Sequence, residues 1–150
     1  MQKLWAVGLC VLALAMPGAA PAQQDGWSYA YTDGVATATE RDDDNRVTAT
    51  LTCRPPTGDI VITDYSLARA ARRANTAQVR IGAMAVNVPA SVQGRGRERA
   101  LVINLPQRPP VLAAVQPNDQ LSVTVNGESR TYRTGGPAKM REVAYACWGS

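Results

Sequence analysis

The chain contains no histidine, and this absence removes several kinds of chemistry. Ser-His-Asp and Cys-His catalysis use an imidazole as general base, and zinc or copper sites built on imidazole need it as a ligand. Beyond residue 22 there is one lysine, Lys139, so a Ser-Lys dyad would have to use it. Lys139 lies at the start of an expected helix, two residues after Pro137, and we interpret it as an exposed helix residue.

Long apolar runs are also scarce, since only residues 4–16 form one. This run is about 13 residues long, whereas a helix that crosses a membrane needs roughly 20. It follows the positive charge of Lys3 and leads into small residues that end at Ala22, which is the layout of a cleavable secretory signal peptide. We therefore expect residues 1–22 to be removed. Residues 23–150 then form a single β-rich domain, periplasmic or secreted, with no membrane span.

Cysteine occurs three times in the chain. Cys10 falls within the expected signal peptide and follows Leu9, where lipid attachment normally needs a small residue, so we do not expect a lipid anchor. Cys53 and Cys147 remain, in a compartment where disulfides persist, and we predict one structural bridge between them. A redox-active pair would normally have Cys-x-x-Cys spacing, which this pair lacks.

Phenylalanine is absent, and small branched residues carry the apolar pattern, which favours a β core. Alternating apolar and polar residues predict strands near 27–32, 35–39, 46–53, 59–64, 78–81, 84–88, 99–105, 121–125 and 128–134. The pairs Asp33-Gly34 and Asn126-Gly127 separate two such runs each and predict tight hairpins. We expect a mainly β fold, an antiparallel β-sandwich or a partly open barrel of about eight strands.

Two helices are expected beside these strands. The prolines at 109 and 110 precede an apolar stretch and predict a short helix near 110–116. Met140, Val143 and Cys147 share one stripe of a helix over residues 138–148. The disulfide would pin this C-terminal helix to the strand that ends in Cys53.

The order of these segments resembles that of known periplasmic proteins. A strand that begins at Trp27, a strand that ends Leu51-Thr52-Cys53, and a late helix from Gly136 to Cys147 are similar to small uncharacterised disulfide-bonded β-sandwich proteins of the bacterial periplasm. More distantly, they are similar to the invasion-associated locus B type. The resemblance implies a periplasmic β-sandwich without known chemistry, and it assigns no functional residue.

Positive charge comes almost entirely from arginine. The whole chain has a net charge of +4, and Lys3 is the only charged residue in 1–22, so the remaining chain carries +3. Six arginines fall in two clusters: Arg69, Arg72 and Arg73, and then Arg95, Arg97 and Arg99. Guanidinium groups match phosphate and carboxylate geometry, so these are the candidate anion-binding residues. The alternative is two solvated connections.

The two clusters are expected at the same end of the sheet, because two strands joined by a turn at Gly82-Ala83 separate them. The six arginines would then form one patch for an anionic envelope polymer or another envelope protein. A nucleic-acid partner is not expected, since export removes it and the net charge is small.

Carboxylates offer a different hypothesis, because two acids about 5 to 10 Å apart can hydrolyse a glycosidic bond. Most of the twelve acids, however, fall at expected turns or strand ends. Residues 42–45, Asp-Asp-Asp-Asn, offer oxygen ligands for calcium but lack the glycine and the distant glutamate of an EF-hand loop. We interpret them as a polar turn.

One aromatic row is present, in which Trp27, Tyr29 and Tyr31 share a strand face. Such a row can stack on sugars or pack into a core, and the sequence favours the core. The sequence as a whole predicts an exported, non-enzymatic binding or envelope accessory protein of unknown specificity, with no cofactor and no metal. The alternative is a carboxylate-dependent hydrolase that acts on an envelope polysaccharide.

Overall fold

The structure is a computed structural model that describes residues 26–55, 58–106, 112, 115–116 and 118–149. The expected signal peptide, residues 1–22, lies outside the described residues, and so does most of the expected helix near 110–116.

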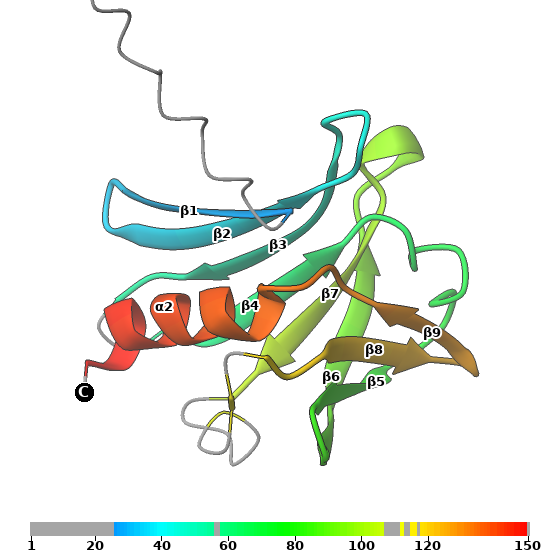
Figure 1. The fold of residues 1–150 in the computed structure, drawn as a ribbon. Helices are drawn as coiled ribbons and strands as arrows, with labels where there is room; N and C mark the ends of the chain where they lie inside the picture. The colour runs from blue at the N-terminus through cyan, green and yellow to red at the C-terminus, as the bar shows by residue number, and fades with distance from the viewer. Residues whose placement is uncertain (1–25, 56–57, 107–111, 113–114, 117, 150) are drawn as a thin grey trace, which may run out of the picture.

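Nine strands occur in the described part of the chain. They are β1 (Trp27–Thr32), β2 (Val35–Arg41), β3 (Val47–Cys53), β4 (Ile60–Asp64), β5 (Thr76–Ile81), β6 (Met84–Gln93), β7 (Ala100–Leu105), β8 (Leu121–Val125) and β9 (Glu128–Thr131). All neighbouring pairs are antiparallel, in the order β1-β2-β3-β4-β7-β6-β5-β8-β9. The sheet curls into a half-barrel (Figure 1). The mainly β prediction is confirmed, and of the two architectures expected the structure is the partly open barrel.

The curl depends on β6, which pairs with two different strands along its length. Its first half pairs with β5 as far as Pro89, and its second half pairs with β7 from Ala90 onward. Proline has no N–H to donate to a ladder, so it suits the point where a strand changes partner. The two halves of the sheet therefore turn toward each other, which brings β9 close to β2, β3 and β4.

The tight hairpins form where the sequence predicts them. Asp33 and Gly34 join β1 to β2 with φ of 51° and 74°, and Asn126 and Gly127 join β8 to β9 with φ of 48° and 84°. These are the left-handed conformations that a type I′ turn needs at both central residues. Gly82 likewise lies in the turn between β5 and β6.

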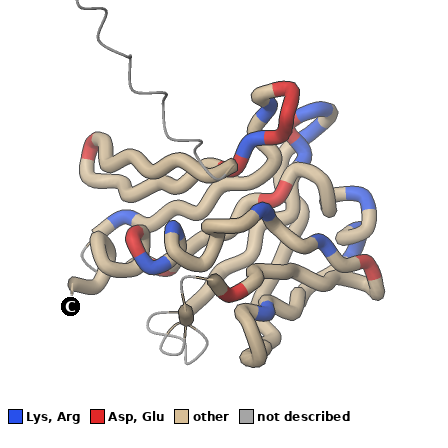
Figure 2. Tube along the Cα trace, viewed as in Figure 1, with Lys and Arg blue, Asp and Glu red and all other residues tan. Residues whose placement is uncertain are grey.

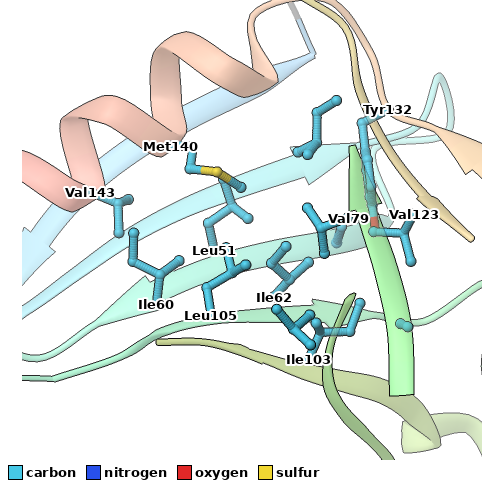
Figure 3. Close-up of a cluster of buried hydrophobic side chains, with 14 of the residues drawn as sticks. Leu51, Ile60, Ile62, Val79, Ile103, Leu105, Val123, Tyr132, Met140 and Val143 are labelled. Atoms are coloured by element: carbon cyan, nitrogen blue, oxygen red, sulfur yellow. The ribbon is translucent and has the colours of Figure 1, made fainter. Parts of the chain in front are cut away.

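The C-terminal helix α2 (Gly136–Trp148) lies across β1, β2 and β3. Met140 and Val143 of α2 are fully buried against the core residues Leu51, Ile60 and Leu105 (Figure 3). Farther along the same stripe, Cys147 forms the predicted disulfide with Cys53 at the end of β3, with the two Cα atoms 5.9 Å apart. In the part of the chain that the structure describes, no helix is long and apolar enough to cross a membrane.

The aromatic row of β1 is divided between the core and the surface. Trp27 is 2% exposed, as expected, whereas Tyr29 is 36% and Tyr31 is 56% exposed, so the interpretation of both tyrosines as core residues is wrong. The reason is that β1 is an edge strand whose first residue alone reaches the core. There Trp27 packs beside Tyr132, with ring centroids 6.0 Å apart.

The disulfide should stabilise the fold as one bond shared by two residues. We expect Cys147→Ser to lower the free energy of unfolding by about 2 to 5 kcal/mol, because the bridge closes a loop between residues 94 apart. Cys53→Ser should cost the same, and the double variant no more than either single one. Urea unfolding of the three variants measures this, and additive losses would show that the cysteines act separately.

Candidate anion-binding site

The two arginine clusters lie in neighbouring connections of the half-barrel. Arg69, Arg72 and Arg73 belong to the connection between β4 and β5, while Arg95, Arg97 and Arg99 lie in or beside the 3-10 helix η1 (Gly96–Glu98), between β6 and β7. Because β5 and β6 form a hairpin, the chain returns to the end from which it left. Figure 2 shows both connections on the same side of the molecule, at the upper right.

Three of the six arginines line one open pocket of about 580 Å³. The lining residues are Arg73, Ala74, Ser91, Val92, Gly94, Arg95, Gly96 and Arg99. This set contains three guanidinium groups and no carboxylate. We call it the basic pocket. The other members of the clusters, Arg69, Arg72 and Arg97, are exposed but do not line it.

Glycines shape the wall of the basic pocket around Arg95. Gly94 and Gly96 have φ of 78° and 58°, conformations that glycine adopts without steric cost. A Cβ at Gly94 would overlap the carbonyl oxygen of Glu98. The two glycines among the arginines of residues 94–99 thus have a structural reason, since the backbone at both positions adopts a conformation that favours glycine.

The connection between β4 and β5 contributes a strained residue to the basic pocket. Arg73 has φ of 65°, and the other described non-glycine residues with positive φ, which are Asp33, Asn45 and Asn126, are of types that tolerate it. Strained backbone of this kind clusters at functional sites. The connection that carries Arg73 is held in place by Asn126, whose side-chain amide donates a hydrogen bond of 2.8 Å to the carbonyl oxygen of Ala70.

The six arginines have no ion-pair partner among the carboxylates that the structure describes. Glu98 is exposed between them but does not line the basic pocket. Each guanidinium carries five N–H donors and a permanent charge, so the pocket offers a concentrated set of donors to an anion.

A second cluster of charged residues, not expected from the sequence, is buried. Glu40 and Asp64 are 1% and 0% exposed, and Arg130 forms ion pairs with both. The Nη2 atom of Arg130 donates to the Oε2 atom of Glu40, and the Nη1 atom donates to the Oδ2 atom of Asp64 at 2.5 Å. We call this arrangement the Arg130 bridge.

The strand register explains why Arg130 reaches both acids. Glu40 of β2 lies opposite Ala49 of β3, and Ala49 lies opposite Asp64 of β4. The two acids are therefore two strand spacings apart, roughly 10 Å, on the core face of the sheet. The small side chain of Ala49 leaves room between them for the guanidinium, which also donates to the carbonyl oxygen of Thr48 at 3.0 Å.

The neighbours of Arg130 complete the connection between β9 and the other side of the half-barrel. The hydroxyl of Tyr132 donates to Asp64 at 2.7 Å, and the backbone N–H of Arg133 donates to Glu40 at 2.7 Å. The indole N–H of Trp27 donates to the carbonyl oxygen of Arg133 at 3.2 Å. Every buried side-chain nitrogen and oxygen of the described residues has a partner.

Asp64 also connects the Arg130 bridge to the basic pocket. While its Oδ2 atom faces Arg130 and Tyr132, its Oδ1 atom accepts hydrogen bonds from the backbone N–H groups of Ser66 and Leu67 at 2.8 and 2.7 Å. These bonds fix the start of the connection that carries Arg73.

A signal for the buried acids exists in the sequence. Period two places Glu40 on the same face as Ala36 and Ala38, and Asp64 on the same face as Ile60 and Ile62. An acid at an inward position predicts a buried partner, because an unpaired buried charge is costly. The partner, Arg130, is far away in the sequence and is not identified by local pattern.

The acidic turn has the structure of a polar turn. Asp42 accepts a hydrogen bond from the backbone N–H of Arg46 at 2.8 Å, and Asp44 forms an ion pair with the Arg46 side chain at 3.3 Å. Asp43 forms an ion pair with Arg133 at 2.7 Å. All three carboxylates thus hold groups of the protein itself.

Comparisons of the chain with protein-family models, with curated proteins and with solved structures each gave no match.

Removal of the Arg130 side chain should destabilise the fold strongly. Arg130→Ala leaves two buried carboxylates without a counter-charge, and we expect a loss of about 3 to 5 kcal/mol in the free energy of unfolding. Because a loss of this size can prevent folding, Arg130→Lys provides a second variant, which keeps the charge but not the planar fork. Its free energy of unfolding should lie between those of the wild type and Arg130→Ala.

The matched control for this measurement is Arg46→Ala. Its ion pair with Asp44 is exposed, with side chains 75% and 68% accessible, so the loss should stay below about 1 kcal/mol. Equal losses for Arg130→Ala and Arg46→Ala in urea unfolding would contradict the structural role of the Arg130 bridge.

Tyr132 should make stability sensitive to alkaline pH. Burial, followed by the charge of Asp64, raises the pKa of Tyr132 well above its ordinary value of 10.0. At a pH above the ordinary value, the unfolded chain releases the phenolic proton while the folded chain keeps it. The contribution of Tyr132 to the free energy of unfolding therefore falls as the pH rises. Tyr132→Phe has no proton to release. It should therefore lose less stability than the wild type when unfolding is compared at about pH 9 and about pH 11; equal losses would show that Tyr132 is not the group responsible.

Proposed function

We propose that this protein is exported and binds an anionic envelope polymer, without catalysis, at the basic pocket. The observation that carries this proposal is that Arg73, Arg95 and Arg99, from two separate connections, line one pocket whose lining includes no carboxylate. Phosphate and carboxylate groups are the anions that guanidinium recognises best, since two parallel N–H bonds can form to each.

The position of the remaining arginines favours a polymer over a small ion. A single exposed charge contributes little to binding, but several together attract a polyanion in a manner that depends on salt. Arg69, Arg72 and Arg97 are exposed in the same two connections, outside the pocket. A polyanion that occupies the basic pocket can also contact these exposed arginines, whereas a single small anion cannot.

Export is supported by two features of the chain. Residues 1–22 have the layout of a signal peptide, and the Cys53–Cys147 disulfide suits an oxidising compartment. The resemblance to disulfide-bonded periplasmic proteins, with the invasion-associated locus B type as a distant likeness, points to the same location.

The hydrolase alternative finds less support in the described residues. Glycoside hydrolysis needs two acids that face the substrate. The acids that the fold brings close together, Glu40 and Asp64, are enclosed and bound to Arg130. We therefore favour binding over hydrolysis.

The test is binding of purified lipopolysaccharide, which carries phosphate groups, and of poly-L-glutamate, which carries carboxylates, by isothermal titration calorimetry. The double variant Arg95→Glu/Arg99→Glu should weaken binding of at least one of them about tenfold or more, and rising salt should weaken wild-type binding. Arg73→Gly should also weaken it, since glycine removes the guanidinium while accepting the positive φ.

The control is Arg54→Glu/Arg80→Glu, which changes the net charge by the same amount at two exposed arginines that do not line the basic pocket. If this control weakens binding as much as Arg95→Glu/Arg99→Glu does, the polymer is attracted by the net charge of the protein, and the basic pocket is not a specific binding site. Absence of binding to both polymers at low salt would overturn the proposal.

A further inference from the structure

A second pocket lies between β1 and α2, apart from the basic pocket. Its volume is about 460 Å³, and it is lined by Tyr29 of β1 and by Ala138, Arg141, Glu142, Tyr145 and Ala146 of α2. We call it the tyrosine groove. It shares no lining residue with the basic pocket.

The groove exists because α2 has two distinct stripes. Met140, Val143 and Cys147 face the core, whereas Ala138, Arg141, Glu142 and Tyr145 recur at i, i+3, i+4 and i+7 and form a neighbouring stripe toward β1. The core covers only the first stripe, so the second stays largely open to solvent and can contact a ligand.

Strand β1 supplies the facing wall. Tyr29 and Tyr31 share a strand face with Trp27, and the indole of Trp27 lies next to Gly136 at the start of α2. From that point β1 and α2 run in the same direction (Figure 1). Tyr31 therefore extends the aromatic row along the strand, beyond the residues that line the groove.

The exposure of these tyrosines is unusual for the described residues. Tyr29, Tyr31 and Tyr145 are 36%, 56% and 66% exposed, and they are three of the five large apolar side chains that the described surface exposes. Single exposed apolar side chains are ordinary, but a group of them on one surface marks a binding site. Tyrosine suits such a site because it combines a flat apolar ring with a polar hydroxyl.

The charges of the groove indicate a neutral ligand. Arg141 and Glu142 contribute one charge of each sign, and Glu142 also forms an ion pair with Lys139 at 2.8 Å. The arginine offers N–H donors and the glutamate offers acceptors, side by side. Sugar hydroxyls both donate and accept, so they satisfy both residues. A proline-rich peptide, the other common occupant of aromatic grooves, offers mainly carbonyl acceptors, which suit Arg141 but give Glu142 no donor beyond Lys139.

We propose that the tyrosine groove binds a neutral stretch of a polysaccharide. Sugar rings stack on Tyr29 and Tyr145, and their hydroxyl groups bond Arg141 and Glu142. This site is independent of the basic pocket, and its occupation does not require the anion-binding function.

The experiment is a titration of the full mature chain with two probes, the hexamer of β-1,4-linked N-acetylglucosamine and the hexamer of β-1,4-linked glucose, followed by NMR of the backbone amides. We expect shifts in β1 and α2 with at least one hexamer. Tyr145→Ala and Tyr29→Ala should each weaken its binding about fivefold or more. Tyr145 is largely exposed, so its removal leaves the fold intact, and circular dichroism checks this.

Two control variants test whether binding depends on the tyrosine groove. Tyr65→Ala removes a tyrosine of comparable exposure, 39%, that does not line the groove and should leave the affinity unchanged. Arg95→Glu/Arg99→Glu should also leave it unchanged. The proposal is overturned if neither hexamer shifts the groove amides at millimolar concentration, or if Tyr65→Ala weakens binding as much as Tyr145→Ala. Binding of a proline-rich decapeptide that depends on Tyr145, in place of the hexamers, overturns it as well.

Discussion

The Arg130 bridge is the interaction on which the rest of this structure depends. The half-barrel has an open side, and β9 approaches β2, β3 and β4 there without joining their ladder. Glu40 and Asp64 occupy core positions at that side, where each charge alone would cost several kcal/mol to bury. The planar fork of Arg130 contacts both carboxylates at once, and this geometry offsets the cost of their desolvation.

The bridge is also connected to the segment that carries Arg73 of the basic pocket. Asp64 uses one oxygen for Arg130 and Tyr132 and the other for the backbone at Ser66 and Leu67. In the middle of the same connection, the side-chain amide of Asn126, from the turn between β8 and β9, donates a hydrogen bond to the carbonyl oxygen of Ala70. The segment that carries Arg73 is thus fastened to both sides of the half-barrel, and the strain at Arg73 persists because its surroundings are fixed.

Local sequence pattern was sufficient for most of the fold. Most strands, the hairpin turns at Asp33-Gly34 and Asn126-Gly127 and the buried stripe of α2 each depend on residues close in sequence. The strand expected at 84–88 continues through Pro89 to Gln93, so the half of β6 that pairs with β7 was missed. The disulfide had only one possible pairing, Cys53 with Cys147. The meeting of Arg73 with Arg95 and Arg99 could also be predicted, because a single hairpin, β5 to β6, separates the two clusters. The other three arginines of the expected patch do not line the pocket. Apart from the disulfide, each feature that could be predicted is determined by residues in one strand, helix or hairpin, or in the connections next to it.

The features that could not be predicted depend on the curl of the sheet. Arg130 meets Asp64 across 66 sequence positions, and only the change of partner along β6 brings them together. The exposure of Tyr29 and Tyr31 depends on β1 being the edge strand, which period two does not reveal. Periodicity predicts that residues share a face, but the topology decides whether that face is covered.

Anion binding at the basic pocket is best measured by NMR of the backbone amides during titration with a short polyphosphate. If the pocket binds anions, shifts concentrate at Arg73, Ala74 and residues 91–99, and they saturate with one midpoint. Shifts spread evenly over arginines remote from the pocket, such as Arg54 and Arg80, would contradict it, as would a spectrum that does not change.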